Sequence, residues 1–492
     1  MARLEEEMRD EHRLRRILGP VQLTSLGVGA IIGAGIFVAT GAAAHNVGGP
    51  ALILSYVVAG VTCIFAALCY AEFAAMVPVA GSAYTYAYAT MGELFAWIIG
   101  WDLVLEYAVG SATVATGWSG YFQNVLSKVG IHVSPLFRES PWRYDAAAGK
   151  FLSTGSILNL PAIVIVALVT MILVKGIQES ASFNAAMVMI KVAAVLFVIG
   201  VGAFFVDTAN WHPFAPFGWT GVSFFGYHVA GQTDPGGSPV GVLAGAAIIF
   251  FAYIGFDSVS THTEEARNPR RDVPIGIVAS LLICTVLYIA VVAVLTGMVK
   301  YDQLDINAPV SRAFQQKGIG WAEGIIATAG VAGITSVLLV MMLSGPRVFL
   351  AMARDGLVPQ SFFGAVHEKF RTPWKSTIAI GVFVTVMAGF LPIDALLHLA
   401  NIGTLLAFVI VCGAVLIMRR TNPDAHRPFR CPWVPFVPVM GILTCLLLMF
   451  SLPTANWWRL FTWLGIGLVI YIFYGRHHSV LQKDRDRGIP AH

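Results

Sequence analysis

Long apolar stretches are the feature of this sequence that most limits what the chain can fold into. Segments 157–174 and 240–256 contain no Asp, Glu, Lys or Arg, and segment 188–206 contains only Lys191. Each is close to the roughly 20 residues that a helix needs to cross a bilayer. Only 12% of the 492 residues are charged, against about 25% in a typical soluble domain. The sequence therefore predicts a protein that crosses a membrane many times.

We count about 12 such segments, each near the length of one bilayer crossing. They predict an all-α polytopic membrane protein, because a helix satisfies its own backbone hydrogen bonds in lipid. A count of about 11 or 13 stays open, since the boundaries within 376–418 and before 435 are ambiguous. The expected spans are 21–46, 51–77, 93–124, 157–174, 184–206, 240–262, 275–298, 322–352, 376–391, 394–418, 435–452 and 458–475.

The basic residues predict the orientation of these spans. With the N-terminus in the cytoplasm, an alternating map places most of the 31 Lys and Arg residues on the cytoplasmic side, as the positive-inside rule requires. The first 20 residues lack the apolar core of a cleavable signal peptide. We therefore expect both termini in the cytoplasm and the chain in the cell membrane. The clusters that decide this are Arg13, Arg15 and Arg16; Arg267, Arg270 and Arg271; and Arg419, Arg420, Arg427 and Arg430.

Several function classes are disfavoured by the motifs that the sequence lacks. The six cysteines show no metal-ligand spacing, and HExxH, GxSxG and Walker motifs are absent. The net charge of +4 follows from the positive-inside bias and gives no reason to expect nucleic acid. We therefore expect no enzyme activity, no cofactor, no metal and no nucleic-acid partner.

Glycines interrupt two of the expected spans at similar depth. Span 21–46 contains five glycines, and each disfavours helix by about 1 kcal/mol relative to alanine. Close helix packing explains such glycines as well as an unwound backbone does. The depth of the glycines in the membrane distinguishes the two interpretations. Gly33 lies roughly 18 Å into its span and Gly255 about 20 Å into span 240–262, which runs the opposite way. Both fall near mid-membrane, which is typical of the binding site of a secondary transporter.

Unwound turns expose N–H groups that suit a carboxylate and carbonyls that suit an ammonium. An α-amino acid, which carries both groups, therefore fits such a site.

Several motifs carry a resemblance to a known family. They are GAIIGAGIF, YAEFAAMVPVAGSAYTY, GWDLVLEY, FFAYIGFDSVSTHTEEARNPRRDVPIGI, ARDGLVP, NIGTLLAF and FRCPWVPFVP. In this order, over roughly residues 18–475, the chain resembles the amino acid–polyamine–organocation superfamily and within it the cationic amino acid transporters. The resemblance implies a LeuT-like core of two inverted five-helix repeats with two additional C-terminal transmembrane helices. The segments expected from it are 1–20 (cytoplasmic), 21–206 (first repeat), 207–239 (extracellular loop), 240–418 (second repeat), 419–475 (last two spans) and 476–492 (cytoplasmic tail).

The resemblance also implies where an amino acid would bind. Its carboxylate would meet the unwound backbone of the first span, and its ammonium would meet carbonyls of the first and sixth spans. In this sequence the first set is Ile32, Gly33, Ala34, Gly35 and Ile36, and the second is Phe251, Ala252 and Ile254. Met341, in VLLVMMLSG, matches the position where the family varies the depth of the pocket, although it also suits a packing role.

Lys191 lies roughly 12 Å inside its expected span. A lysine at such depth costs about 3 kcal/mol on insertion scales and is a functional candidate, although a snorkelling side chain is the plainer alternative. A lysine that releases its proton near neutrality can couple transport to protons. In similar proton-linked members of the superfamily, a lysine of the fifth span occupies the place of the sodium ion. We therefore expect proton coupling and no sodium requirement.

Carboxylates inside the membrane are further candidates. Asp102 and Glu106 are four residues apart and lie on one helix face. Glu106, deeper by about 6 Å, is the stronger candidate for substrate or proton handling, and its position resembles the family's acidic residue near the pocket. Asp257 follows the second interruption and either caps the next half-helix or takes part in binding.

Glu72, Glu265 and Arg267 resemble the family's inner gate, where salt bridges would break and form during transport. A solvated charge cluster is the alternative for Glu265 and Arg267.

The sequence as a whole predicts a secondary amino acid transporter that works by alternating access. A thioether at position 341 fills volume that a long cationic side chain needs, so small or broadly accepted neutral amino acids such as alanine are expected. A cationic amino acid exchanger or uniporter, and an amino acid sensor on a transporter scaffold, are the alternatives. The expected partners are the amino acid, protons and the lipid bilayer, while a bound sterol or lipid and an accessory membrane subunit stay open.

Overall fold

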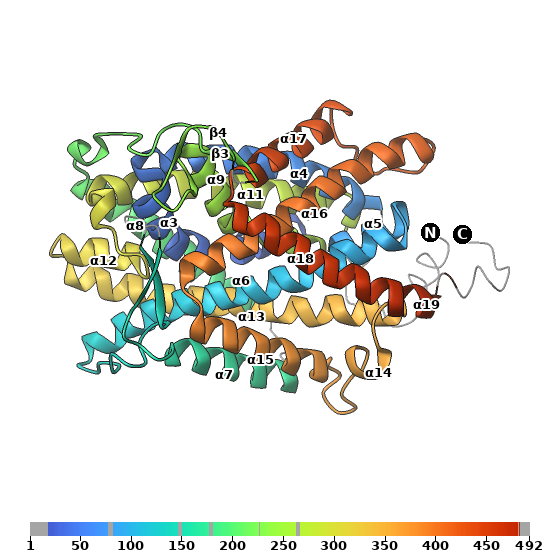
Figure 1. Cartoon of the computed structure of the whole chain (residues 1–492), viewed down its shortest axis with the longest axis horizontal. Coiled ribbons are helices and arrows are strands. Elements are labelled where there is room, and N and C mark those ends of the chain that lie inside the picture. The colour runs from blue at the N-terminus through green and yellow to red at the C-terminus, as the bar shows by residue number, and fades with distance from the viewer. Residues whose placement is uncertain are drawn as a thin grey trace.

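The computed structural model describes residues 18–76, 82–145, 150–176, 181–225, 227–261, 266–480 and 482. This part of the chain is mainly helical, and its long helices run side by side in one bundle (Figure 1). Every expected span coincides with helical structure. Among the described residues, seven helices are long and apolar enough to cross a membrane, and four shorter apolar helices accompany them. The first long segment, Pro20–Met76, contains two of the expected spans.

The first half of the chain begins with a helix in several pieces. These are α2 (Pro20–Ile31), η1 (Gly35–Ala39), α3 (Thr40–Ala43), η2 (Ala44–Gly48) and η3 (Gly49–Ala51). They are followed by α4 (Leu52–Met76), α5 (Ser82–Thr90), α6 (Glu93–Lys128), α7 (Leu160–Lys175), α8 (Ala181–Gly202), η4 (Ala203–Phe205) and η5 (Thr208–Trp211).

The second half repeats a helix in pieces and then longer helices. The pieces are α9 (Val242–Ile249), η6 (Phe250–Tyr253) and α10 (Ser258–Thr261). They are followed by α11 (Pro269–Met298), η8 (Tyr301–Gln303), α12 (Pro309–Gln316), α13 (Gly320–Arg354), α14 (Gln360–Phe363), α15 (Trp374–Phe390) and α16 (Ile393–Thr421). The chain ends with α17 (Phe436–Phe450), α18 (Thr454–Ile470), η9 (Tyr471–Gly475) and α19 (Arg476–His478).

Local chemistry explains several helix ends. Pro20 occupies the first turn of α2, where its missing N–H costs no hydrogen bond. The Asn159 side chain caps α7 by accepting from the backbone N–H of Ala162 at 3.3 Å. Gly92, with φ of +92°, turns the chain between α5 and α6.

Three small antiparallel sheets within the described part of the chain correct the all-α expectation. They pair β1 (Trp142–Asp145) with β2 (Lys150–Ser153), β3 (Val222–Phe224) with β4 (Tyr227–Ala230), and β5 (Gln232–Thr233) with β6 (Pro239–Val240). All lie in the two long loops rather than in the bundle. Sequence periodicity missed them because two-residue to four-residue strands are too short to produce an alternating pattern.

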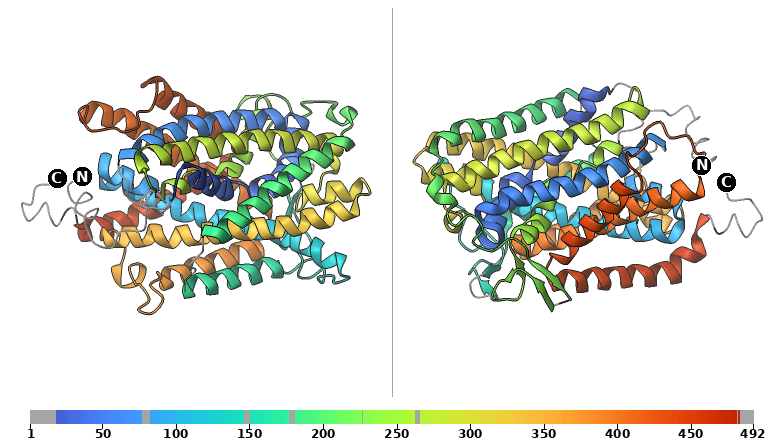
Figure 2. Two further views of the ribbon diagram at one scale, coloured as in Figure 1. Left: turned by 180° about the vertical axis from the view of Figure 1, so that it is seen from behind. Right: turned by 90° about the horizontal axis from the view of Figure 1, so that it is seen from above.

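Helices from the two halves pack directly against each other. Helix α4 packs on α11, α6 on α13, α7 on α15, and η1 on η6. Seen from behind, the dark-blue α2 lies in the middle of the bundle (Figure 2), in contact with α8 and α11. Large apolar side chains such as Val286 and Phe473 are exposed on the outside, as expected where lipid replaces water as the solvent.

Candidate functional site

The first helix stops inside its glycine-rich run. Helix α2 ends at Ile31, Ile32 has an extended backbone (ψ 107°), and helical structure resumes at Gly35 as a five-residue π-helix. The interruption predicted at Gly33 is confirmed. A restarted helix leaves its first N–H groups without intrahelical partners, so backbone donors are available at this point.

The second interruption lies at Gly255. Helix α9 gives way to a 3₁₀ turn at Phe250, and Ile254 then adopts an extended backbone (ψ 132°). Gly255 has φ of +114°, a conformation that glycine tolerates far better than other residues. A Cβ on Gly255 would lie 2.8 Å from the carbonyl oxygen of Ala30. This interruption is also confirmed, and it faces the first one.

The two interruptions pack backbone to backbone. A Cβ on Gly35 would overlap the Cα of Ala252, so this glycine permits the approach. The Tyr288 hydroxyl donates to the carbonyl oxygen of Ile31 at 2.8 Å and lies 3.1 Å from that of Ala252. The side-chain amide of Asn401 donates to the carbonyl oxygens of Ala247 and Ile248 at 2.9 and 2.8 Å. Side chains from α11 and α16 therefore hold the carbonyls beside the breaks.

Lys191 on α8 reaches this centre. Its Nζ donates to the carbonyl oxygen of Gly29 on α2 at 2.6 Å and to the Ser336 hydroxyl on α13 at 3.3 Å. The residue is only 1% exposed, so the side chain does not snorkel to a surface. It links three helices that carry the predicted site.

Three buried carboxylates lie near one another. Asp102 and Glu106 on α6 and Asp257 after η6 are 3%, 6% and 7% exposed. The Tyr107 hydroxyl donates to Asp257 Oδ2 at 3.4 Å. Asp257 is one of the charged neighbours of Glu106, so the structure brings these predicted residues together.

Met341 on α13 lies next to the second break. A Cβ on Gly110 would lie 3.2 Å from the Met341 sulfur and 3.8 Å from the Phe251 ring. Gly110 is four residues after Glu106 on α6, so it lies on the same helix face. Met341 and Phe251 therefore border the same small space, which the glycine at position 110 leaves open.

The predicted gate residues divide between two places. Glu72 joins a buried cluster in which Arg419 Nε and Nη2 donate to its two carboxylate oxygens at 2.9 and 2.7 Å. Arg427 Nε lies 3.3 Å from Glu72 Oε1. Arg267 instead follows Ala266, and its backbone N–H donates to the carbonyl oxygen of Leu18 at 2.8 Å. Glu265 lies outside the described residues.

A further contact closes the same end of the bundle. The Tyr84 hydroxyl on α5 donates to Asp355 Oδ2, after α13, at 2.6 Å. Burial, together with the Asp355 carboxylate, raises the pKa of the Tyr84 phenol well above its ordinary value. The phenol therefore stays protonated and keeps donating at physiological pH.

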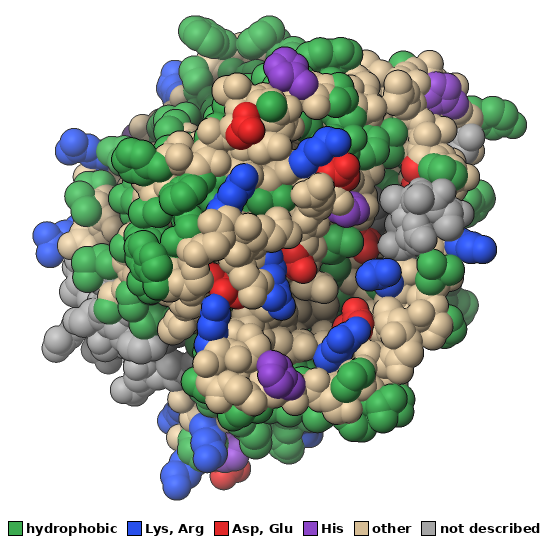
Figure 3. Space-filling model, turned by 90° about the vertical axis from the view of Figure 1, so that its left-hand side faces the viewer, with side chains coloured by type: hydrophobic (Ala, Val, Ile, Leu, Met, Phe, Trp, Pro, Cys, Tyr) green, Lys and Arg blue, Asp and Glu red, His purple; other side chains and the backbone are tan. Residues whose placement is uncertain are grey.

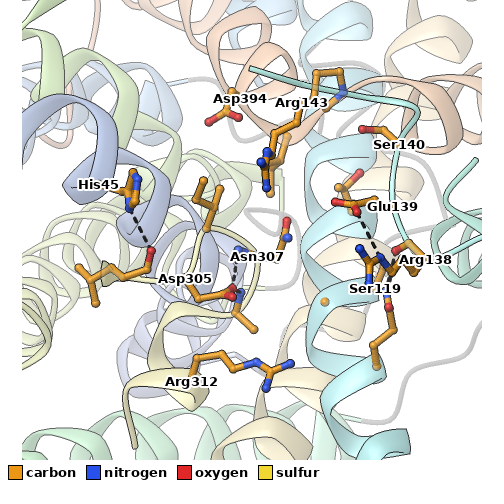
Figure 4. A pocket seen from close by; sticks show the side chains of 18 of the residues that line it. His45, Ser119, Arg138, Glu139, Ser140, Arg143, Asp305, Asn307, Arg312 and Asp394 are labelled. Carbon is orange, nitrogen blue, oxygen red and sulfur yellow. Dashed lines mark hydrogen bonds and ion pairs between the residues drawn. The ribbon is translucent and has the colours of Figure 1, made fainter. Parts of the chain in front are cut away.

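The opposite end of the bundle contains a cavity of about 730 Å³, which we call the vestibule. Acidic and basic side chains surround a hollow on this face (Figure 3). Figure 4 shows arginines and acids on facing walls, with Arg143 and Asp394 close together. Thr116 and Ser119 of α6 form part of its wall. The labelled side chains are His45, Ser119, Arg138, Glu139, Ser140, Arg143, Asp305, Asn307, Arg312 and Asp394.

Comparison with known proteins identifies the family. The family model described as amino acid permease matches residues 18–473. The chain belongs to the amino acid permease family. The cell membrane is therefore the location of this permease, which spans it several times and is a transporter rather than an enzyme.

Named relatives of this permease differ in substrate. It is 47% identical to the branched-chain amino acid permease BcaP of Bacillus subtilis, over 96% of each chain. It is 43% identical to the methylthioribose transporter of the same organism, over 96% of this chain and 95% of the relative. It is 31% identical to the vacuolar cationic amino acid transporter 4 of Arabidopsis thaliana, over 96% of this chain and 94% of the relative. The predicted resemblance to the superfamily and to cationic amino acid transporters is thus confirmed.

Sequence reasoning missed two residues that organise the centre of this permease. Tyr288 and Asn401 bond the carbonyls beside the breaks, yet neither was a predicted site residue. A signal was present, because each is a polar side chain within an expected apolar span and such groups seek partners in the protein interior.

Proposed function

We propose that this permease imports neutral L-amino acids by proton-coupled, sodium-independent alternating access. The most direct support is the hydrogen bond that the Lys191 ammonium donates to the Gly29 carbonyl oxygen at 2.6 Å, beside the first helix break. A cation held by a carbonyl of α2 and a hydroxyl of α13 resembles a bound metal cation in its contacts. Loss of its proton would weaken both bonds and release α2 from α8 and α13.

The proposed scaffold is a LeuT-like pair of inverted repeats, 21–206 and 240–418, with about 12 spans and cytoplasmic termini. Support comes from the packing of α4 on α11, α6 on α13, α7 on α15 and η1 on η6. Each pair joins expected spans that are five apart. In this orientation the vestibule opens to the outside, and segment 207–239 is extracellular.

The proposed substrate site lies between the two breaks. The substrate carboxylate would accept hydrogen bonds from the backbone of the restarted first helix, within Ile32 to Ile36, where the helix dipole also favours an anion. Its ammonium would meet carbonyls near Phe251, Ala252 and Ile254. These break residues are nearly all buried, which favours strong polar contacts with a ligand because water is excluded.

The proposed preference for neutral side chains depends on Met341 and Phe251. Both are buried and both border the position that a side chain on Gly110 would occupy. Apolar walls favour small or branched aliphatic side chains, in line with the relative named as a branched-chain amino acid permease.

A cationic substrate is the second candidate. Glu106 and Asp257 are buried and offer negative charge near the same space, and one relative is named a cationic amino acid transporter. Exchange or uniport of arginine or lysine would use this charge. A sensor role would require binding without transport.

Alternating access would require the contacts at the Tyr84 end to break. The proposed gate there includes the predicted Glu72, Glu265 and Arg267. Its described contacts are those of Glu72 with Arg419, of Leu18 with Arg267 and of Tyr84 with Asp355. All must open for a substrate to leave toward that side.

Uptake into proteoliposomes tests the proposal. Purified permease is reconstituted in sodium-free buffer, and uptake of labelled alanine, leucine and arginine is followed with and without an inward proton gradient. For a one-proton symporter, a gradient of one pH unit supports about tenfold accumulation, since it is worth about 1.4 kcal/mol. Accumulation that requires sodium, or that ignores the proton gradient, overturns the proposed proton coupling. Uptake of arginine in preference to leucine favours a cationic substrate. Binding of an amino acid without uptake favours a sensor role.

A further inference from the structure

Two buried carboxylate oxygens on α6 lack hydrogen-bond partners within the part of the chain that the structure describes. Asp102 Oδ2 and Glu106 Oε2 are buried, and neither has a hydrogen-bond partner among the described residues. The Asp102 carboxylate presses against α16, where a Cβ on Gly403 would lie 2.7 Å from its Oδ1. A buried carboxylate oxygen without a hydrogen-bond partner is unfavourable, so a missing partner is indicated.

A small cavity lies beside these two carboxylates. It measures about 20 Å³, and Asp102, Glu106, Asn456 and Arg459 line it together with apolar residues. A cavity of about 10–15 Å³ holds one water when it offers two to four polar partners. This carboxylate cavity satisfies both requirements, because the two carboxylates and two side chains of α18 line it.

The carboxylate cavity is the last of three in a row. A side cavity of about 150 Å³ shares Asn456 and Arg459 with it. The side cavity in turn shares Asn46 and Asp394 with the vestibule. The described residues that line these three cavities include none from the two helix breaks. The series of cavities therefore lies beside the proposed substrate site rather than in it.

We propose that water in these cavities forms a side route that carries protons between the vestibule and Glu106. This rests on the proton coupling proposed above. A proton from vestibule water binds Asp394, passes through water in the side cavity, and reaches Glu106 through the water shared with Asp102. One proton leaves the solvent and one carboxylate gains it, so no other reactant is needed.

The charges along the route suit this task. Arg143 and the Asn46 amide face Asp394, and Asp394 lines both the vestibule and the side cavity. Asp102 on the same helix and Asp257 face Glu106, and this concentration of negative charge attracts a proton. Arg459 lies at the entrance to the carboxylate cavity, where its positive charge opposes passage of a cation. Its side chain is exposed, and its Nη1 donates to Asn456 Oδ1 at 3.5 Å. In the proposed route Arg459 is the gate.

Two variants block the route without touching the proposed substrate site. Ala395→Phe fills the side cavity that Ala395 lines, and Asn456→Leu removes a polar wall at nearly constant volume. Gly465→Phe is the control, since a Cβ at Gly465 on α18 meets no atom within 4 Å. Arg459→Gln removes the gate charge, with Arg459→Lys as its conservative partner.

The readouts separate proton movement from substrate movement. Substrate-triggered proton influx is followed with a pH-sensitive dye inside proteoliposomes, and amino acid counterflow is measured at equal pH on both sides. We expect both blocking variants to lower proton influx by about tenfold, the effect of about 1.4 kcal/mol on a barrier. Counterflow should stay at the wild-type rate, the control should match wild type, and Arg459→Gln should dissipate an imposed pH gradient without substrate while Arg459→Lys does not.

Each alternative result has a distinct meaning. Wild-type permease that moves no protons with substrate overturns the proposed coupling and the route with it. Coupled wild type with normal proton influx in both blocking variants overturns the side route alone. Parallel loss of influx and counterflow in both variants also overturns it, because it indicates a structural role for these positions.

Discussion

Replacement of Gly35 by alanine tests the approach of the two helix breaks. The new methyl group would overlap the Cα of Ala252 and lie 3.1 Å from its backbone nitrogen. Backbone atoms cannot turn aside as a side chain does, so the broken helices must separate. Overpacking of this kind costs about 1–3 kcal/mol, whereas alanine returns at most about 1 kcal/mol through its better helix propensity.

The cost should appear in substrate binding, because the proposed site is built from these two backbones. A loss of about 1–2 kcal/mol weakens binding by about 5–30-fold. We would measure binding of labelled leucine to detergent-solubilised protein by scintillation proximity, together with the thermal unfolding midpoint. Gly413→Ala is the matched control, since its Cβ would meet no atom within 4 Å, and it should bind as wild type does.

Two outcomes would refute this reasoning. Wild-type affinity and wild-type stability in Gly35→Ala would mean that the two backbones do not approach closely in the functional protein. Lower stability with unchanged affinity would mean that they do approach, but that the substrate binds elsewhere.

Three further predictions concern coupling, selectivity and stability. Lys191→Met should abolish accumulation driven by a one-unit pH gradient, a loss of about tenfold, while the exposed control Lys175→Met retains it; equal accumulation in both would exclude coupling through position 191. Met341→Ser should raise arginine uptake relative to leucine in competition assays, because it removes a bulky thioether, and an unchanged ratio would contradict the pocket assignment. Glu72→Gln should destabilise the protein by about 3–5 kcal/mol, since it leaves a buried guanidinium without its carboxylate. Glu139→Gln is the control: it breaks the exposed pair with Arg138 and should change the free energy of unfolding by less than about 1 kcal/mol. Similar denaturation midpoints for the two variants would count against a buried cluster around Glu72.

Helix positions were largely predictable from the sequence for a simple physical reason. Lipid forces each crossing segment to be apolar and to close its own backbone hydrogen bonds, so span 93–124 was recognisable and α6 covers it. The interruptions were predictable too, because glycines at 33 and 255 stand out against apolar surroundings. The short hairpins of the loops were not, since β1 to β6 are each only two to four residues long.

The partners of each polar group depended on tertiary structure. Sequence made Lys191 a functional candidate inside the membrane and left a snorkelling side chain open, whereas the packing of α2 and α13 determines that it bonds Gly29 and Ser336. Glu72 was assigned to a gate with Glu265 and Arg267, whereas its described partners Arg419 and Arg427 come from the end of α16 and the following loop. Sequence spacing could not show this, because contacts between residues more than 300 positions apart depend on how the helices pack.

The sequence by itself determined that this protein spans a membrane, where two of its helices break, and which polar residues lie within its apolar segments. These properties depend on the cost of placing polar groups in lipid, which acts on each segment separately. Only the tertiary structure decided that Gly35 meets Ala252, that Tyr288 and Asn401 hold the carbonyls beside the breaks, and that a small cavity borders Glu106. Those relations arise from the packing of helices from both halves, and no single segment contains them.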